Sequence, residues 1–535
     1  MTKRSDNIVR VGRHDYANPM RGAVAAGHPL TAEAGAEVLA AGGNAVDACI
    51  AAAFVSWVTE STLTGPGAGG FMLVYRASDR TTRVLDHFVT VPGIGLKGEV
   101  REMEPVDVAY APESTQVFRI GAATCAVPGA VAGLGEAHRR FASLPWPVLL
   151  EPAIRHAREG VALTETQAYL HAILDLILRH TPEGARIYSA GGKRLEEGDR
   201  LVMSDLASTL EELAERGADD FYRGAIARKL SAHLSEEGGA LTAQDLADYR
   251  VVQRRPVRAP FFGHEFESNP PPSTGGALIG FGIGLLDRLG IDGEPGSAEA
   301  IAQLAEIMRE QESARSHAGF GSSLHRGGLV RKLYAAASLR AAAQRLRSRL
   351  PETVSGTTHI SVVDGRGDAA SLTASTGSGS GIIVPGTGIQ LNNMLGEFDL
   401  MATGRVPRPG IRFTSGMAPS LVLRDGKPRL VVGSAGPLRL RGAIFQIVVN
   451  VVGHGLGVEE AIGRPRVHLD GDRLHCEGGT DPAEIERLAA WGYDVIRWRS
   501  RNLFFGGASG VEFRPDGTLA AAGDPRRGGH GIVVE

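Results

Sequence analysis

SGTTHISVVD, at residues 355–364, is the stretch on which the interpretation of this sequence depends. Ser355 and Gly356 are small residues that favour a turn, and two threonines then open a predicted strand. A threonine hydroxyl is a weak nucleophile unless a base lies beside it. A cut before Thr357 would supply that base on the same residue, because a free α-amine titrates near pH ~7.7–8.0. Taken alone, the motif also fits two β-branched residues at the start of an ordinary strand.

The chain before this stretch has mostly helical patterns. A helix is expected to begin at Thr31, and 45–58 predicts a second helix that is apolar all round and therefore buried. GPGAGG (65–70) follows that helix and precedes a strand, which is the reverse of the order in a dinucleotide-binding loop. We therefore expect its backbone to pack closely against another segment rather than to bind a nucleotide. Residues 145–255 and 329–350 also predict helices.

From residue 357 the patterns are those of strands. Asp364-Gly365 and Asp425-Gly426 stand between alternating apolar runs, as hairpin turns do. One helix, 441–455, is predicted among these strands. The change in pattern places a discontinuity at 356/357.

Composition excludes several classes of protein. The 535 residues include 57 Lys+Arg and 60 Asp+Glu, a net charge of −3, so we expect neither nucleic-acid nor membrane partners. Apolar residues make up 43%, which suffices for a large core, and three cysteines cannot form a disulfide framework. No apolar stretch follows the basic N-terminus, so a cytoplasmic location is expected, although a removed export signal would look the same. The histidines show no metal-binding spacing, and no cofactor or metal is predicted.

A series of further motifs carries a resemblance. In order they are GAVAAGHPLTAEAGAEVLAAGGNAVDA (22–48), VPGAVAGL (127–134), FYRGAIA (221–227), GGALTAQDLADY (238–249), PPPSTGG (270–276), TTH (357–359), VPGTGIQLNN (384–393) and DPRRGGHG (524–531). With these motifs, the chain resembles a divergent member of the γ-glutamyltranspeptidase family of self-processing N-terminal-nucleophile hydrolases, over nearly its whole length.

The resemblance implies an α+β fold, a four-layer αββα sandwich, and an enzyme that cuts its own precursor between Gly356 and Thr357. Residues 1–356 would form the large subunit and 357–535 the small one, intertwined in a single domain. The implied catalytic residues are Thr357 as nucleophile, Ser375 as its hydrogen-bonding partner and Gly436 as an oxyanion donor. For the substrate, the resemblance implies Glu397 opposite an α-ammonium group, and Thr414 and Ser415 around an α-carboxylate.

Four departures from the family pattern affect the predicted pocket. Phe88 stands at the position of an arginine that binds the α-carboxylate. Loss of that arginine removes a charge-assisted bond worth ~1.5–3 kcal/mol. Met394 replaces a Gln or Glu. The segment after Ser375 is shorter, and its usual asparagine has no clear equivalent. Pro437 replaces the second oxyanion glycine, and proline has no N–H to donate.

Three hypotheses follow for function. The first is amide hydrolysis or acyl transfer through Thr357, with γ-glutamyl compounds as the family default. The second is hydrolysis of a C–C bond next to a carbonyl by the same nucleophile, as divergent family members do in antibiotic biosynthesis; an apolar pocket at Phe88 and Met394 suits it. The third is an uncleaved, non-catalytic homologue, against which the intact Thr357 and Ser375 argue. In the first two, the partners are a small-molecule substrate and the two chains of one precursor; a homo-oligomer is left open.

Overall fold

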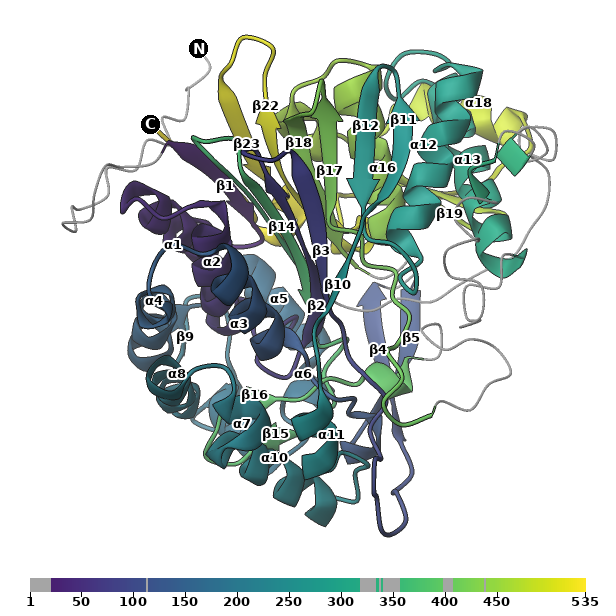
Figure 1. Cartoon of the computed structure of the whole chain (residues 1–535). Coiled ribbons are helices and arrows are strands. Elements are labelled where there is room, and N and C mark those ends of the chain that lie inside the picture. Colours follow the sequence, from purple (N-terminus) through teal and green to yellow (C-terminus); the bar gives the residue numbers. More distant parts are fainter. Residues whose placement is uncertain are drawn as a thin grey trace.

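The computed structural model describes residues 21–111, 114–317, 333–335, 338–339, 357–397, 408–436 and 439–535. Two large antiparallel sheets lie face to face, and helices cover the outer face of each (Figure 1). This is the predicted four-layer αββα sandwich, with α1 (Pro29–Ala40) and α2 (Ala45–Thr59) on one outside and α12 (Gly275–Leu289) and α16 (Arg439–Val448) on the other.

The first sheet has seven strands and contains the stretch that opens at Thr357. In spatial order they are β10 (Val252–Arg254), β3 (Thr81–His87), β2 (Gly69–Arg76), β14 (Ala369–Ser375), β13 (Thr358–Asp364), β1 (Gly22–Ala26) and β24 (His530–Val534). Four of these precede residue 357 in the sequence and three follow it. The two parts of the chain therefore contribute strands to the same sheet, with β1 between β13 and β24.

The second sheet has six strands. They are β11 (Val257–Phe261), β12 (His264–Ser268), β17 (Ser420–Arg424), β18 (Lys427–Ala435), β22 (Gly507–Phe513) and β23 (Leu519–Gly523). β13 packs over β18 and β22, so the centres of the two sheets face each other. The helices on its far side are α12, α16, α13 (Ala298–His317) and α17 (Val458–Gly463).

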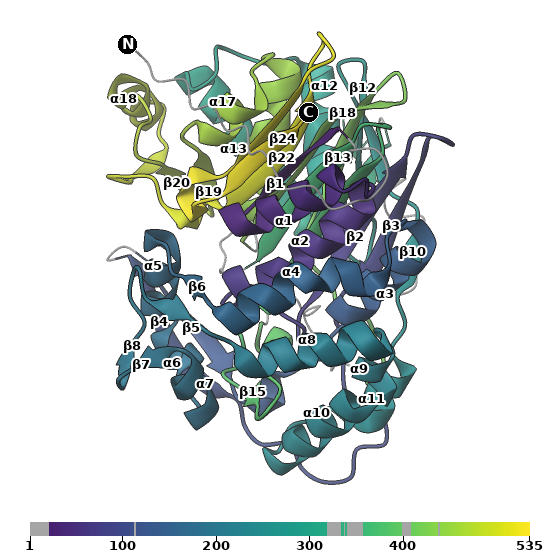
Figure 2. The ribbon, with the colours of Figure 1, turned by 90° about the vertical axis from the view of Figure 1, so that its left-hand side faces the viewer.

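A lower region of the molecule is mainly helical, as predicted for 145–255 (Figure 2). α4 (Trp146–Glu159) and α8 (Ser204–Arg216) pack together against α2, and the remaining helices are α3 (Ala130–Phe141), α5 (Glu165–Ile173), α6 (Asp175–Leu178), α7 (Pro182–Ile187), α9 (Asp220–Arg223), α10 (Ala225–Glu236) and α11 (Ala243–Asp248). Four small sheets among the described residues have two strands each: β4 (Glu104–Ala111) with β5 (Ser114–Ile120), β6 (Val161–Ala162) with β9 (Arg200–Leu201), β7 (Ser189–Ala190) with β8 (Lys193–Arg194), and β15 (Ile383–Val384) with β16 (Ile389–Gln390).

A separate three-stranded sheet lies beside α18 (Pro482–Ala490). Its strands are β19 (Val467–Asp470), β20 (Arg473–Cys476) and β21 (Asp494–Arg497).

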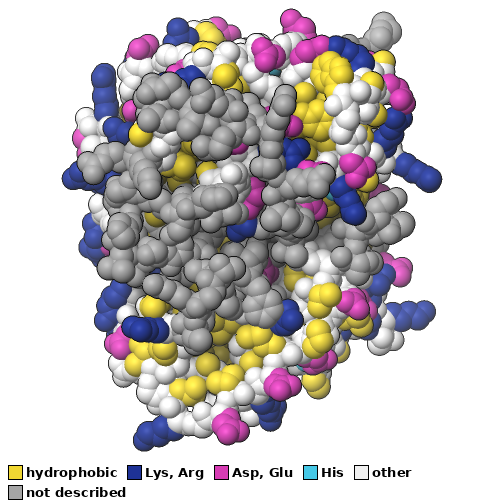
Figure 3. All heavy atoms as spheres, turned by 90° about the vertical axis from the view of Figure 1, so that its right-hand side faces the viewer, with side chains coloured by type: hydrophobic (Ala, Val, Ile, Leu, Met, Phe, Trp, Pro, Cys, Tyr) yellow, Lys and Arg dark blue, Asp and Glu magenta, His cyan; other side chains and the backbone are white. Residues whose placement is uncertain are grey.

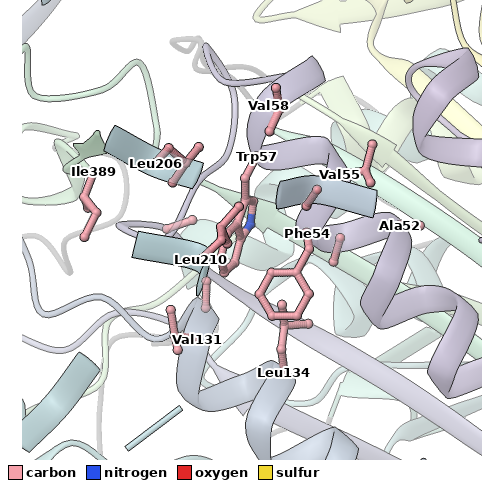
Figure 4. Packing of buried hydrophobic residues seen from close by; sticks show 14 of the residues in the cluster. Ala52, Phe54, Val55, Trp57, Val58, Val131, Leu134, Leu206, Leu210 and Ile389 are labelled. Atoms are coloured by element: carbon pink, nitrogen blue, oxygen red, sulfur yellow. The ribbon is translucent and has the colours of Figure 1, made fainter. Parts of the chain in front are cut away.

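The helix α2 is buried along its whole length, as its sequence predicts. Asn44 caps it in a reciprocal capping box with Asp47. Its rings Phe54 and Trp57 meet edge to face with centroids 4.7 Å apart, and they point into a cluster with side chains of α3 and α8 (Figure 4). This cluster anchors α2 behind β13.

The predicted start of the first helix is wrong by two residues. Helix α1 begins at Pro29, not at Thr31, because His28 accepts a hydrogen bond from the Leu30 N–H and Pro29 supplies a preset φ at the first position. Thr31 is instead a buried residue of the first turn. Its hydroxyl does not cap α1 but lies 2.8 Å from the hydroxyl of Thr59 in α2.

The predicted turns are confirmed. Asp364-Gly365 lies between β13 and β14, and Asp425-Gly426 joins β17 to β18 with φ of 53° and 70°, both in the left-handed region. GPGAGG also packs as expected, since a Cβ on Gly67 would lie 2.2 Å from the Gln390 carbonyl. The predicted helix at 441–455 is α16 followed by a π-helical turn, Val449–Gly453. The helix predicted over 329–350 falls almost wholly outside the described residues.

The described surface carries mixed charge. On the face shown in Figure 3, the basic and acidic side chains of the described residues are interspersed, which fits the net charge of −3. Within the described ranges, no helix has the length and apolarity needed to cross a membrane.

Candidate active site

Thr357 lies immediately before β13, at the centre of the first sheet, and is 2% exposed. Side chains alternate along a strand. Ile360 and Val362 pack on the helix side, whereas His359 lies against Gly433 of the second sheet. By this alternation Thr357 faces the second sheet.

Ser375 is brought beside Thr357 by the pairing of β13 with β14. Thr358 is opposite Ala374 in that register, so one further step sets Ser375 opposite Thr357. The Ser375 hydroxyl accepts a hydrogen bond from the Gly377 N–H at 2.7 Å. The predicted nucleophile and its predicted hydroxyl partner are therefore strand neighbours.

Gly436 directly follows β18, on the sheet that faces Thr357. Its φ is 107°, a conformation open to glycine but strained for other residues, and a Cβ built on it would lie 3.8 Å from Gly506. Gly507, which follows Gly506, packs so closely on Arg527 that a Cβ there would lie 2.2 Å from the arginine side chain. Arg527 in turn donates a hydrogen bond to the Thr357 carbonyl. These contacts connect the segment of Gly436 to the nucleophile.

The DPRRGG segment that supplies Arg527 is held by buried ion pairs. Arg526 pairs with Glu477 and, at 3.0 Å, with Asp524. Arg466 pairs with Asp524 at 2.7 Å and donates to the Phe505 carbonyl at 3.1 Å. All four charged side chains are buried, so the ionic network fixes both Arg527 and the Phe505–Gly506 backbone beside Gly436.

On the helix side of β13, Glu60 lies behind the first strand residue. Its Oε2 accepts a hydrogen bond from the Thr358 hydroxyl at 2.5 Å. Burial raises the pKa of Glu60 to about 7, although its hydrogen bond from Thr358 and the nearby Arg527 act to lower it. A carboxyl group thus titrates near neutral pH one residue from Thr357.

His359 is a neutral residue of the interior. Its two ring nitrogens lie 2.8 Å from the Thr373 hydroxyl and 2.9 Å from the Ser361 hydroxyl, and burial lowers its pKa to about 3. A proton-shuttling histidine would titrate close to neutral pH. His359 therefore supports the packing between the sheets instead.

The predicted substrate residues Phe88 and Met394 lie in the apolar core between the two sheets. Phe88 is fully buried and stacks on Phe71, with ring centroids 5.6 Å apart. The same cluster includes Phe413 and Met417.

Backbone pairing brings the Phe88 segment next to Thr414 and Ser415. The Phe413 N–H donates to the Val89 carbonyl at 3.1 Å. Ser415 is buried; its carbonyl accepts from the Ser273 hydroxyl at 3.0 Å, which ties it to the PPPSTGG motif. Two motifs far apart in sequence therefore meet at the predicted carboxylate site.

Glu397 is 7% exposed and lies at the glycine-rich loop after Ser375. A Cβ on Gly377 would be 2.7 Å from Glu397 Oε1 and 2.1 Å from Asn393 Oδ1. Asn393 also accepts from the Ser378 N–H at 3.0 Å. The acid predicted for the α-ammonium group thus lies against the loop that follows Ser375.

A cation, Arg412, contacts the backbone of Phe88. Arg412 donates to the Phe88 carbonyl and, at 2.5 Å, to the Tyr249 hydroxyl, and it lies 3.6 Å from Asp86. The Arg412 guanidinium is thus engaged by the Phe88 backbone, Tyr249 and Asp86.

Two predicted residues, Gly356 and Pro437, lie outside the described residues. Arg527 belongs to the DPRRGGHG motif but was not predicted to have a role, and no prediction was made for Glu60. The available signal for Glu60 was a lone acid at the end of the apolar helix 45–58. Within the described ranges, His, Cys, Asp and Glu side chains form no group of three that could hold a metal ion.

Comparison with known proteins identifies the family of the chain. A family model described as gamma-glutamyltranspeptidase matches residues 31–534. The chain belongs to the gamma-glutamyltranspeptidase family. It is 34% identical to a glutathione hydrolase proenzyme of Pseudomonas aeruginosa, over 96% of this chain and 95% of that one. It is 32% identical to the acylase ACY 1 proenzyme of Pseudomonas sp. (strain SE83), over 97% and 94%.

A solved structure shares the fold of this family member. The crystal structure of a cephalosporin acylase from Bacillus halodurans superposes with a TM-score of 0.84 at 24% identity and covers 100% of both chains. The protein is therefore an enzyme, a hydrolase or transferase with the N-terminal-nucleophile fold. At about 30% identity to the curated relatives, it is a divergent member of its family.

Proposed function

We propose that the chain is a proenzyme that cuts itself between Gly356 and Thr357, and that the freed Thr357 then attacks amide carbonyls of small molecules. The observation that carries this proposal is the position of Thr357: it opens a central strand, with Ser375 as its strand neighbour and its carbonyl held by Arg527. Both curated relatives described above are named proenzymes, which supports the cut.

In turnover, the α-amine of Thr357 takes the hydroxyl proton as Oγ forms a bond to the acyl carbon. The negative oxygen that develops needs N–H donors, and the backbone N–H of Gly436 is the predicted one. The C–N bond of the substrate then breaks, and the leaving amine takes the proton. Water releases the acyl group as an acid, or an acceptor amine takes it as a new amide.

The substrate class is γ-glutamyl compounds or related amides. Glu397 beside the glycine-rich loop supports recognition of an α-ammonium group, whereas Phe88 and Met394 present no cation to an α-carboxylate. An acyl group whose binding depends little on a carboxylate fits this pocket better than a γ-glutamyl group does. Three anilides separate these features: γ-glutamyl, glutaryl (which lacks the ammonium) and 4-aminobutyryl (which lacks the carboxylate).

Electrophoresis and N-terminal sequencing test the cut. The purified chain should yield two pieces, the smaller one beginning at Thr357, and Thr357→Ala should stay intact. Thr357→Ser keeps the hydroxyl and should still cut. An intact wild-type chain would instead support a non-catalytic homologue.

The same apolar cluster favours a second candidate reaction. With Phe88 stacked on Phe71, the pocket suits hydrolysis of a C–C bond next to a carbonyl in a substrate without glutamyl charges. A fully cut enzyme that releases no anilide from any of the three probes at millimolar concentration would support this candidate over amide hydrolysis.

A further inference from the structure

Thr358, the residue after the proposed nucleophile, is held by a buried carboxylate from another element. Its hydroxyl donates to Glu60 Oε2 at 2.5 Å. Glu60 caps the C-terminus of α2, which packs against β13, and it is 6% exposed. An acid placed this deep requires partners to offset its lost hydration, and the strand end supplies one of them.

The surroundings fix Glu60 in this position. The Thr31 hydroxyl lies 3.4 Å from its Oε1 and 2.8 Å from the Thr59 hydroxyl. On the other side, a Cβ on Gly27 would lie 2.3 Å from Oε2. A side chain at residue 27 would therefore displace the carboxylate, and glycine leaves the room that Glu60 occupies.

The neighbouring residue is held by the opposite charge. Arg527 donates to the Thr357 carbonyl, and it is close enough to Glu60 to act on its titration. Thr357 and Thr358, at the start of β13, are thus each bound by a charged side chain, Thr358 by Glu60 at the end of α2 and Thr357 by Arg527 of the C-terminal segment. Neither contact uses the peptide bond between Gly356 and Thr357.

This independence matters once the peptide bond before Thr357 is cut. A chain end in a strand tends to fray, because its last residue loses the tether on one side. The attacking oxygen nevertheless has to stay close to one geometry, since a misplacement of about 1 Å can cost 10²-fold in rate.

We propose that Glu60 is a positioning residue for the nucleophile: through the Thr358 hydroxyl, its carboxylate holds the new end of β13, and with it Thr357, in place for attack. This proposal rests on the proposed function of Thr357. It extends that function to a residue on the far side of the strand, which does not touch the substrate.

The full-length chain tests this with a pair of substitutions at one position. Thr358→Val removes the hydroxyl and keeps the shape, whereas Thr358→Ser keeps the hydroxyl. In the cut enzyme, with γ-glutamyl and glutaryl anilides as probes, Thr358→Val should lower kcat by about 10- to 100-fold with little change in KM. Thr358→Ser should restore most of the loss. Thr209→Val is the matched control, since the buried Thr209 hydroxyl donates to the Thr387 carbonyl at 2.8 Å in another part of the molecule.

Glu60→Gln, alone and combined with Thr358→Val, shows whether Glu60 acts through that hydroxyl. We expect Glu60→Gln to lower kcat in the wild-type background and to add nothing in the Thr358→Val background. An equal loss in both backgrounds would overturn the proposal, as would a kcat of Thr358→Val that matches the Thr209→Val control. Where a variant cuts poorly, the half-time of self-cleavage replaces kcat in the same comparison.

These outcomes are distinct from failure of the proposed function. If the wild-type chain stays intact, or if Thr357→Ala is cut normally, the nucleophile itself is misassigned. If the wild-type chain is cut at Thr357 and Thr358→Val equals its control in both cleavage and turnover, the nucleophile stands and the role of Glu60 is wrong.

Discussion

Thr357 and Phe88 both lie between the two large sheets or at their edge. The side chains around them differ in polarity. Around Thr357, buried charges are numerous and engaged: Glu60 holds Thr358, Arg527 holds the Thr357 carbonyl, and Arg526 belongs to an ionic network behind them. Phe88 belongs to an apolar cluster of aliphatic, aromatic and thioether side chains. The part that would perform the chemistry has polar contacts, whereas Phe88 and Met394, which would face the acyl group, are apolar.

The largest effect is expected from the ionic network. Arg526→Met would leave Glu477 and Asp524 buried with one cation fewer, which should lower the free energy of unfolding by about 3–5 kcal/mol. Urea unfolding measures this. Arg497→Met is the control, because the Arg497–Glu486 pair is exposed and should contribute no more than about 1 kcal/mol. Equal losses in the two variants would mean that the buried charges are not coupled.

Glu60 should make stability depend on pH. Its pKa is raised by burial from 4.5 to about 7, so between these pH values the folded chain binds more protons than the unfolded chain. Stability contributed by the neutral form is therefore present at pH 4.5 and lost as pH rises through 7, by up to about 3 kcal/mol. The difference in unfolding free energy between wild type and Glu60→Gln, measured from pH 4.5 to 8, should fall across this window. A constant difference would show that Glu60 does not titrate there.

Phe88→Arg tests the apolar side by adding the missing cation. A restored charge-assisted bond of about 1.5–3 kcal/mol should raise the preference for the γ-glutamyl anilide over the 4-aminobutyryl anilide by about 10- to 100-fold. The ratio of kcat/KM values within one variant cancels any loss of folded enzyme. Phe88→Leu is the control and should leave the ratio unchanged. No gain with Phe88→Arg would mean that residue 88 does not face the substrate carboxylate.

The smallest effect concerns the contact between the two sheets. A Cβ on Gly433 would lie 2.2 Å from the His359 ring, so Gly433→Ala should cost about 1–3 kcal/mol of stability through overpacking. Gly65→Ala, where a Cβ would meet nothing within 4 Å, should cost far less. Thermal unfolding of both variants compares them directly. Similar midpoints would show that β13 and β18 can move apart at no cost.

Local patterns in the sequence were sufficient for much of the fold. The all-round apolar helix 45–58, the Asp-Gly turns and the strands after residue 357 each carry their signal within a few residues. The start of α1 was misplaced because His28 caps it through a ring nitrogen, and histidine is not among the usual capping residues. The interleaving of strands from both sides of residue 357 came only from the family resemblance, since no local pattern encodes which strands pair.

The candidate site divides in the same way. Ser375 and Gly436 came from motif positions, and the structure sets the first opposite Thr357 and the second on the facing sheet beside Gly506. Glu60 could not be assigned from sequence, because its partner Thr358 is 298 residues away and its role depends on a shared face of β13. Long-range contacts of this kind have no local signature.

The position of β13 has a consequence for how the two pieces of a cut chain would behave. The strand is hydrogen-bonded to β1 on one edge and to β14 on the other, and β14 pairs with β2. Separating the pieces would break the main-chain pairing of β13 with β1 and of β14 with β2 in the middle of the sheet, and that of β24 with β1 at its edge, and each piece alone would expose open strand edges. The pieces should therefore behave as one cooperative unit in unfolding and, once unfolded, should regain the native state only when they refold together.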